Sequence, residues 1–108
     1  MKIHIIVVCG NMTAPLAIAL KKQGHIITGS DQTKIYPPFS TVLSRAKIKV
    51  NQPHPTTALY IIGSGYKNQE KLVTEFETVK KSSIPYISAT NYIAQNLIKT
   101  NSILIAGS

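Results

Sequence analysis

Several residue types are scarce in this chain of 108 residues. There is no tryptophan and only one cysteine, Cys9, so an internal disulfide is excluded. The apolar run near the N-terminus covers about six residues, fewer than the roughly seven to fifteen of a secretion signal. No run approaches the ~18 apolar residues of a membrane helix. We therefore expect a cytoplasmic protein with no membrane partner.

Acidic residues are also few, since four Asp and Glu oppose twelve Lys and Arg for a formal net charge of +8. Eleven of the twelve cations are lysines, and they are spread along the whole chain. A nucleic-acid-binding surface usually gathers arginines and lysines in a stripe with interleaved aromatic residues. The dispersed charge predicts a solvated surface with a mild preference for anions and no nucleic-acid partner.

The first 22 residues organise the chain. An apolar, β-branched run at 3–8 predicts a buried strand, and apolar residues at helical spacing over 14–20 predict a helix. A tight turn at Cys9, Gly10 and Asn11 joins them. The helix start points back across the strand end, where free backbone N–H groups make an anion site.

Strands and helices alternate along the rest of the chain. Strands are expected at 25–28, 47–50, 58–62, 84–88 and 102–106, and helices at 39–46, 68–81 and 90–98. Thr90 and Asn91 are the expected caps of the last helix. This alternation predicts one α/β domain over 1–108, a Rossmann-like three-layer sandwich. Its mainly parallel sheet of about five to six strands has helices on both faces, in the order 3-2-1-4-5 with a sixth strand at the edge.

The turns after positions 8, 28, 62 and 88 fall on one edge of this sheet, where open α/β sheets bind ligands. Asp31 follows the second strand and either accepts hydrogen bonds from a ribose or caps a turn. Gly63, Ser64 and Gly65 flank the same crevice, and the Ser64 hydroxyl suits a phosphate oxygen. The G-x-G-x-x-G fingerprint is absent, and only Gly10 is retained. The pattern favours a nucleotide or nucleotide-sugar.

No complete active site is predicted. Cys9 lies near a helix N-terminus, which can lower a thiol pKa, but we interpret it as a small packing residue. No zinc spacing joins the three histidines, His4, His25 and His54. The glutamates of the helix at 68–81 are expected on its solvated face, namely Glu70, Glu75 and Glu77. Catalytic and metal-binding residues are therefore not expected.

Three segments match the N-terminal domain of the Mur ligases in kind and order, over essentially the whole chain. They are MKIHII at 1–6, GHIITGSD at 24–31 and IPYISATNYIAQNLI at 84–98. The heptapeptide IYPPFST at 35–41 resembles the tyrosine-proline-proline segment of the murein-recycling branch. That branch joins UDP-N-acetylmuramate to L-alanyl-γ-D-glutamyl-meso-diaminopimelate.

The resemblance implies a parent ATP-dependent amide ligase of peptidoglycan synthesis and recycling. Residues 105–108, Ile-Ala-Gly-Ser, resemble the first residues of the family's ATP-binding loop, so we expect a cut there. ATP and Mg²⁺ are then cofactors of the parent, held by ATP-binding and C-terminal domains absent from this chain. The fragment itself is expected to be inactive and to hold no cofactor.

The same resemblance assigns the UDP-sugar site. The first turn and helix start face the UDP-sugar, Ser30 and Asp31 lie near its uridine, and Ser64 and Gly65 lie near its diphosphate. The first group comprises Cys9, Gly10, Asn11, Met12 and Thr13. The sequence departs from the family at 66–68, where Tyr-Lys-Asn replaces a stretch of small residues.

Two other interpretations stay open. One is the N-terminal domain of UDP-N-acetylmuramate–L-alanine ligase, and the other is a non-ligase Rossmann module that binds NAD or another nucleotide. The sequence leaves open whether the parent adds tripeptide or L-alanine, and in what oligomeric state.

Overall fold

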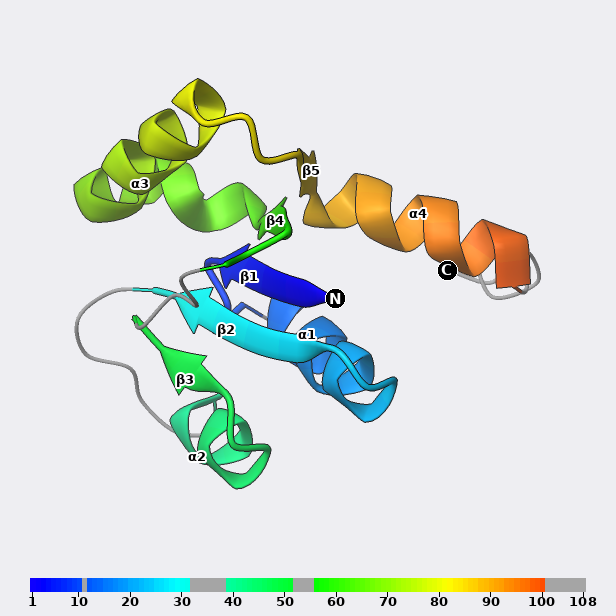
Figure 1. Cartoon of the computed structure of the whole chain (residues 1–108). Coiled ribbons are helices and arrows are strands. Elements are labelled where there is room, and N and C mark those ends of the chain that lie inside the picture. The colour runs from blue at the N-terminus through cyan, green and yellow to red at the C-terminus, as the bar shows by residue number, and fades with distance from the viewer. Residues whose placement is uncertain (11, 32–38, 52–55, 101–108) are drawn as a thin grey trace.

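The computed structural model describes residues 1–10, 12–31, 39–51 and 56–100. Strands and helices alternate along the chain (Figure 1). The strands are β1 (Lys2–Ile6), β2 (Ile26–Ser30), β3 (Lys49–Val50), β4 (Leu59–Ile62) and β5 (Tyr86–Ser88). The helices are α1 (Thr13–Lys22), α2 (Phe39–Arg45), α3 (Glu70–Lys81) and α4 (Ala89–Thr100), with a 3₁₀ helix, η1 (Ser64–Asn68), after β4.

The five strands form one parallel sheet in the order β3-β2-β1-β4-β5. This confirms the predicted α/β architecture and the predicted order of the first five strands. β3 is an edge strand, as its alternating lysines indicated. The sixth strand predicted at 102–106 lies outside the described residues, as does most of the proline-containing heptapeptide at 35–41.

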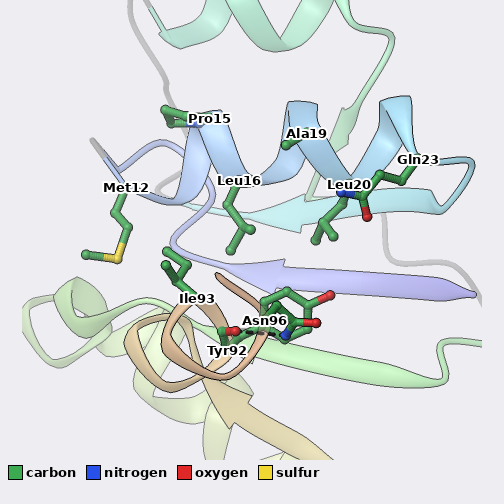
Figure 2. A pocket seen from close by; sticks show the side chains of 9 residues that line it. All are labelled: Met12, Pro15, Leu16, Ala19, Leu20, Gln23, Tyr92, Ile93 and Asn96. Carbon is green, nitrogen blue, oxygen red and sulfur yellow. Dashed lines mark hydrogen bonds between the residues drawn. The ribbon is translucent and has the colours of Figure 1, made fainter. Parts of the chain in front are cut away.

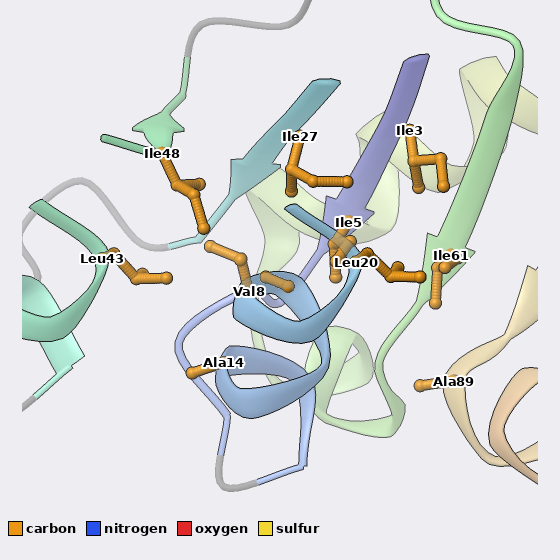
Figure 3. Packing of buried hydrophobic residues seen from close by; sticks show 11 residues of the cluster. Ile3, Ile5, Val8, Ala14, Leu20, Ile27, Leu43, Ile48, Ile61 and Ala89 are labelled. Carbon is orange, nitrogen blue, oxygen red and sulfur yellow. The ribbon is translucent and has the colours of Figure 1, made fainter. Parts of the chain in front are cut away.

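Helices cover both faces of the sheet, as predicted. Alternate residues of β1 point to opposite faces, so Ile3 and Ile5 pack with α1, while Ile6 packs with α3. The larger cluster joins the strands to α1, α2 and the start of α4 (Figure 3). The smaller one lies under α3 and contains Leu72 and Val79. Because β1 is buried on both faces, it is the centre of the domain.

The first strand stops two residues earlier than its apolar pattern predicted. Val7 has a φ of 66°, in the left-handed region that β-branched residues rarely adopt. The amides of Val7 and Val8 both donate to the carbonyl of Ser30, at 2.8 and 3.0 Å. Val8 is nevertheless fully buried and lies against Gly29, where an added Cβ would come within 2.5 Å of the Val8 Cβ. The chain therefore turns sharply while its apolar side chains stay in the core.

Helix boundaries follow local chemistry. Gly24, with a φ of 98°, ends α1 as predicted. The predicted caps of the last helix are wrong, because the hydroxyl of Ser88 accepts the amide of Asn91 at 3.1 Å. The helix expected from residue 68 begins at Glu70, since η1 occupies the preceding residues. Of the glycine turn predicted at 63–65, Gly63 is accordingly the N-cap of η1, and Ser64 and Gly65 are its first residues.

Candidate functional site

The carboxyl ends of the parallel strands meet at one edge of the sheet. Ile6 is in register with Ser30 on one side and with Ile62 on the other, and Ile62 is in register with Ser88. The predicted site residues at 9–13, 30–31 and 64–65 follow these strand ends, so the topology brings them to the same edge. Asn11 lies outside the described residues.

The backbone amides of the first turn donate hydrogen bonds to other groups of the same chain. The amide of Cys9 donates to Oδ2 of Asp31 at 2.9 Å, and that of Gly10 donates to Oγ1 of Thr13 at 3.0 Å. The Thr13 hydroxyl in turn donates to the carbonyl of Val7. With the two valine amides bonded to β2, all four amides of residues 7–10 have partners. The anion site was predicted at the start of α1, where the amide of Ala14 donates to the carbonyl of Gly10 at 3.0 Å, and anion binding there stays a prediction.

Asp31, whose carboxylate accepts the Cys9 amide of this turn, is buried, with 4% of its surface exposed. Its amide donates to Oδ1 of Asn51 at 3.2 Å. The ammonium of Lys71 on α3 donates to the Asp31 carbonyl at 3.1 Å and to Asn51 Oδ1 at 2.8 Å. Of the two roles proposed from the sequence, the structure shows that Asp31 fastens a turn. Contact with a ribose stays a prediction.

Cys9 is half-buried beside the Asp31 carboxylate and packs against the larger core cluster. Burial, then the negative charge and hydrogen bond of Asp31, raise the pKa of the Cys9 thiol to about 11. The thiol is protonated at neutral pH, so it lacks the thiolate that nucleophilic chemistry needs. This supports the interpretation of Cys9 as a packing residue.

A buried polar network lies on the α3 side of β1 and β2. His4 is fully buried, with Nδ1 2.7 Å from the Thr28 hydroxyl and Nε2 2.5 Å from the Ser30 hydroxyl. Ser30 donates to Oε2 of Glu75 on α3 at 2.7 Å. A hydroxyl has one proton to donate, and Ser30 donates it to Glu75, so Nε2 carries the hydrogen of the His4–Ser30 bond. The Tyr60 ring and the imidazole form a T-shaped pair, with ring centroids 5.5 Å apart.

Glu75 was expected on a solvated face, and that expectation is wrong. Its side chain is 26% exposed and lies 3.3 Å from Nε2 of His4. Burial raises the pKa of Glu75, but hydrogen bonds from His4 and Ser30, helped by the positive charges of His4 and Lys71, outweigh it and hold that pKa below its ordinary value. The carboxylate is thus ionised, and it contacts His4 of β1 and Ser30 of β2.

The network joins serine, histidine and carboxylate side chains that the sequence gave no reason to connect, because 26 and 45 residues separate Ser30 from its partners. The only local signal was polarity at alternate strand positions, His4 facing Thr28 across the β1–β2 register. Ser30 is only 3% exposed, and its hydroxyl is engaged with His4 and Glu75, so its predicted contact with the uridine stays a prediction. The network is structural, and Ser30 faces α3 rather than the crevice.

The ends of β4 and β5 are arranged differently. They border a hollow of about 310 Å³, within the size range of ligand pockets. Its lining combines a lysine, hydroxyl groups and aromatic rings: Ile62, Gly63, Ser64, Tyr66, Lys67, Phe76, Tyr86, Ser88 and Thr90. The rings of Tyr66 and Tyr86 each meet Phe76 edge-on, at 4.9 and 5.4 Å between centroids. Of the predicted residues, Ser64 lines this hollow.

A second hollow, of about 400 Å³, lies between α1 and α4 (Figure 2). Leu16 and Leu20 of α1 face Tyr92 and Ile93 of α4 across it, and Met12 is the one predicted site residue in its wall. Its lining is mainly apolar. Within the described ranges, no cluster of His, Cys, Asp and Glu suits a metal ion. None of the helices described is both long and apolar enough to span a bilayer.

An open parallel sheet in this strand order, with helices on both faces, defines a Rossmann-like α/β domain. A family model described as "Mur ligase family, catalytic domain" matches residues 2–100. The chain therefore belongs to the Mur ligase family.

Two curated relatives share a name, UDP-N-acetylmuramate–L-alanyl-γ-D-glutamyl-meso-2,6-diaminoheptandioate ligase. The protein of Escherichia coli K12 is 32% identical, covering 99% of this chain and 24% of its own length. That of Haemophilus influenzae is 31% identical, covering 94% of this chain and 23% of its own length. The chain thus spans about a quarter of the length of these relatives.

Solved structures agree. A murein peptide ligase from Psychrobacter arcticus superposes with a TM-score of 0.71 at 27% identity, over 92% of this chain and 21% of that one. UDP-N-acetylmuramate:L-alanyl-γ-D-glutamyl-meso-diaminopimelate ligase from Neisseria meningitides superposes with a TM-score of 0.69 at 28% identity. The match covers 91% of this chain and 31% of that one. UDP-N-acetylmuramate–alanine ligase from Thermotoga maritima superposes with a TM-score of 0.69 at 18% identity, over 94% of this chain and 24% of that one. At this identity the likeness shows the shared fold alone.

Proposed function

We propose that this chain is the UDP-N-acetylmuramate-binding domain of an ATP-dependent amide ligase. The ligase joins UDP-N-acetylmuramate to L-alanyl-γ-D-glutamyl-meso-diaminopimelate in the synthesis and recycling of peptidoglycan. The match to the Mur ligase family over residues 2–100 carries the proposal, and both curated relatives have names that state this reaction. Because UDP-sugars and ATP are cytoplasmic metabolites, the proposal places the protein in the cytoplasm.

The geometry supports a binding role for the carboxyl edge of the sheet. Its turns carry Gly10, Asp31, Ser64 and Gly65, and η1 places hydroxyl and ammonium groups beside them. The Cys9 thiol is protonated at neutral pH, so it does not supply a thiolate nucleophile. The domain is therefore proposed to bind and orient the UDP-sugar, while the chemistry occurs elsewhere in the parent.

The proposed contacts follow the assignment made from the resemblance, with one refinement. The first turn and helix start, 9–13, face the UDP-sugar, Asp31 lies near the uridine, and Ser64 and Gly65 lie near the diphosphate. Ser30 acts through the buried network, because its hydroxyl is bonded to His4 and Glu75.

ATP and Mg²⁺ belong to the parent enzyme in this proposal. The stretch that resembles an ATP-binding loop, 105–108, lies outside the described residues. The described residues contain no cluster of acidic and histidine side chains that would hold the ion. ATP would supply the energy for amide formation, and this domain would present the muramate carboxylate.

Titration of the isotopically labelled chain with UDP-N-acetylmuramate, followed by amide NMR shifts, tests this proposal. We expect shifts at 9–13, 31 and 64–65. Absence of shifts at millimolar ligand would contradict it. Stronger thermal stabilisation by NAD than by UDP would instead favour a non-ligase module, because a ligand of the folded state stabilises by mass action.

A longer protein that contains this chain would separate the two ligase interpretations. Amide formation with the tripeptide, but not with L-alanine, is the expected result. The reverse preference would favour UDP-N-acetylmuramate–L-alanine ligase.

A further inference from the structure

Asp31 lies just beyond the paired part of the sheet. The last residue pair between β2 and β3 joins Gly29 to Val50. The last pair between β1 and β2 joins Ile6 to Ser30. Regular strand pairing therefore ends before Asp31 on both sides of β2, and other groups must hold this buried residue in place.

Asn51, the residue after β3, extends the pairing by one step with its side chain. Its amide donates to the Gly29 carbonyl at 2.6 Å, and in a parallel ladder the next bond would join the Asp31 amide to the backbone carbonyl of residue 51. Oδ1 of Asn51 takes that place, 3.2 Å from the Asp31 nitrogen. The φ of Asn51 is 63°, in the left-handed region where asparagine is enriched among residues other than glycine. Asparagine at this position therefore supplies both the turn that follows β3 and an acceptor for Asp31.

Lys71 of α3 binds the same corner of the molecule. Its ammonium donates to Oδ1 of Asn51 at 2.8 Å and to the carbonyl of Asp31 at 3.1 Å. A hydrogen bond from a charged donor is stronger than one between neutral groups. The backbone amide and carbonyl of Asp31 are thus both bonded, to one side chain that follows β3 and to one on α3.

The position of Asp31 in turn affects the first turn, because its Oδ2 accepts the amide of Cys9 at 2.9 Å. Two of the segments proposed to face the UDP-sugar, the first turn and Asp31, are therefore joined through one carboxylate. A site that already has its binding conformation before the ligand arrives loses less free energy to ordering on binding. Whatever holds Asp31 in place should therefore contribute to affinity without touching the ligand.

We propose that Asn51, together with Lys71, is a positioning residue of the UDP-sugar site. It holds Asp31, and through the Asp31 carboxylate the first turn, in the conformation that receives the ligand. This inference rests on the proposed function, because it concerns how two segments of the same site are held. Asn51 lies outside the predicted contacts at 9–13, 30–31 and 64–65, and it acts through Asp31.

The test removes the Asn51 side chain from the labelled chain without straining its backbone, with UDP-N-acetylmuramate as the probe. N51G deletes the acceptor but tolerates the left-handed φ, whereas N51D keeps an acceptor oxygen. K47G is the matched control, because Lys47 also has a left-handed φ, of 60°, and precedes β3 instead of following it. We expect N51G to weaken binding about fivefold or more, N51D to restore most of the affinity, and K47G to change it less than about twofold, since only N51G removes the acceptor of the Asp31 amide.

Amide shifts of the free chain give a second readout. In N51G the amides of Cys9 and Asp31 should move even without ligand, because the carboxylate that accepts the Cys9 amide is held less firmly. A residue that served stability alone would lower the free energy of unfolding in urea and leave the dissociation constant of the folded chain unchanged.

A second pair of variants answers the same question if N51G does not fold. K71M removes the ammonium that binds Asn51 and Asp31, and K81M removes an equal charge from the last turn of α3. K71M should weaken binding of UDP-N-acetylmuramate at least about threefold more than K81M, since only K71M loses hydrogen bonds to the Asp31 corner.

Three outcomes are distinct. Weaker binding by N51G than by K47G, or by K71M than by K81M, with a displaced Cys9 amide, supports the inference. Unchanged affinity in the variants that lose contacts to Asp31, or an unmoved Cys9 amide, overturns the inference and leaves the proposed function in place. No binding of UDP-N-acetylmuramate by the unmodified chain overturns both.

Discussion

The carboxyl edge of the sheet has a closed side and an open side. The closed side comprises the ends of β1 and β2, the turn at 7–10 and Asp31, where polar groups are buried and bonded to each other. The open side comprises the ends of β4 and β5 with η1, where a lysine and hydroxyls border a hollow. Both sides follow parallel strands of one sheet, so the strand-end rule alone does not separate them. What separates them is that Ser30, Asp31 and Thr13 supply acceptors for the amides of the first turn on the closed side.

The largest difference between the two sides is expected in the free energy of unfolding, when one glycine on each side is replaced by alanine. Gly29→Ala should destabilise the domain by about 3 kcal/mol, because the new Cβ would overlap the buried Val8 side chain at 2.5–2.7 Å. Gly65→Ala should change stability little, since its nearest contact, Val7 Cγ1, is 3.5 Å away. Urea unfolding of both variants measures the difference. Equal losses would show that the two sides are packed alike.

The next effect concerns thiol reactivity on the closed side. With a pKa of about 11 against an ordinary 9.0, Cys9 should react with iodoacetamide at pH 8 about a hundredfold more slowly than the same thiol in the unfolded chain. The rate should rise as the pH approaches 11. Mass spectrometry of native and urea-unfolded samples measures both rates. Rapid native alkylation at pH 8 would contradict the buried, anion-facing environment.

Paired glutamates of α3 test the buried network. Glu75→Ala should lower the free energy of unfolding by about 2 kcal/mol, because His4 and Ser30 lose the carboxylate that accepts their hydrogen bonds. Glu77→Ala, on the exposed face beside Lys80, should cost much less. Denaturant unfolding at pH 7 distinguishes the two.

The same pair predicts a pH dependence. The pKa of Glu75 is lowered in the folded state, so its contribution is complete above the unfolded value, near 4.5, and is lost as pH falls through the lower folded value. The stability gap between the unmodified chain and Glu75→Ala should therefore narrow below about pH 4.5. A constant gap down to pH 3 would show that the carboxylate charge contributes nothing.

The smallest effect on stability is expected on the open side. Ser88→Ala should lower the free energy of unfolding by about 1 kcal/mol, because the Ser88 hydroxyl accepts the Asn91 amide and so caps α4. Thr90→Ala should be nearly neutral. Thermal unfolding compares them, and the reverse ranking would restore Thr90 as the cap.

Much of the architecture followed from local pattern. Apolar runs of β-branched residues located the strands, Gly24 located the end of α1, and strand–helix alternation predicted the parallel order. Errors arose where tertiary contacts outweighed propensity. Val7 continued a strand pattern, yet its amide turns to the Ser30 carbonyl. Glu75 followed the polar pattern of a lysine-rich helix, yet it is bound by His4 and Ser30.

By itself, the sequence determined the fold class and which turns share the ligand edge, because periodicity and glycine positions act over a few residues and parallel topology does the rest. It did not determine which amides in those turns would be free. Only the tertiary structure decided that Asp31, Ser30 and Thr13 fasten the first turn while Lys67 stays beside an open hollow. The physical reason is that this hydrogen bonding depends on distances between the first turn, the end of β2 and the start of α1, which no local pattern specifies.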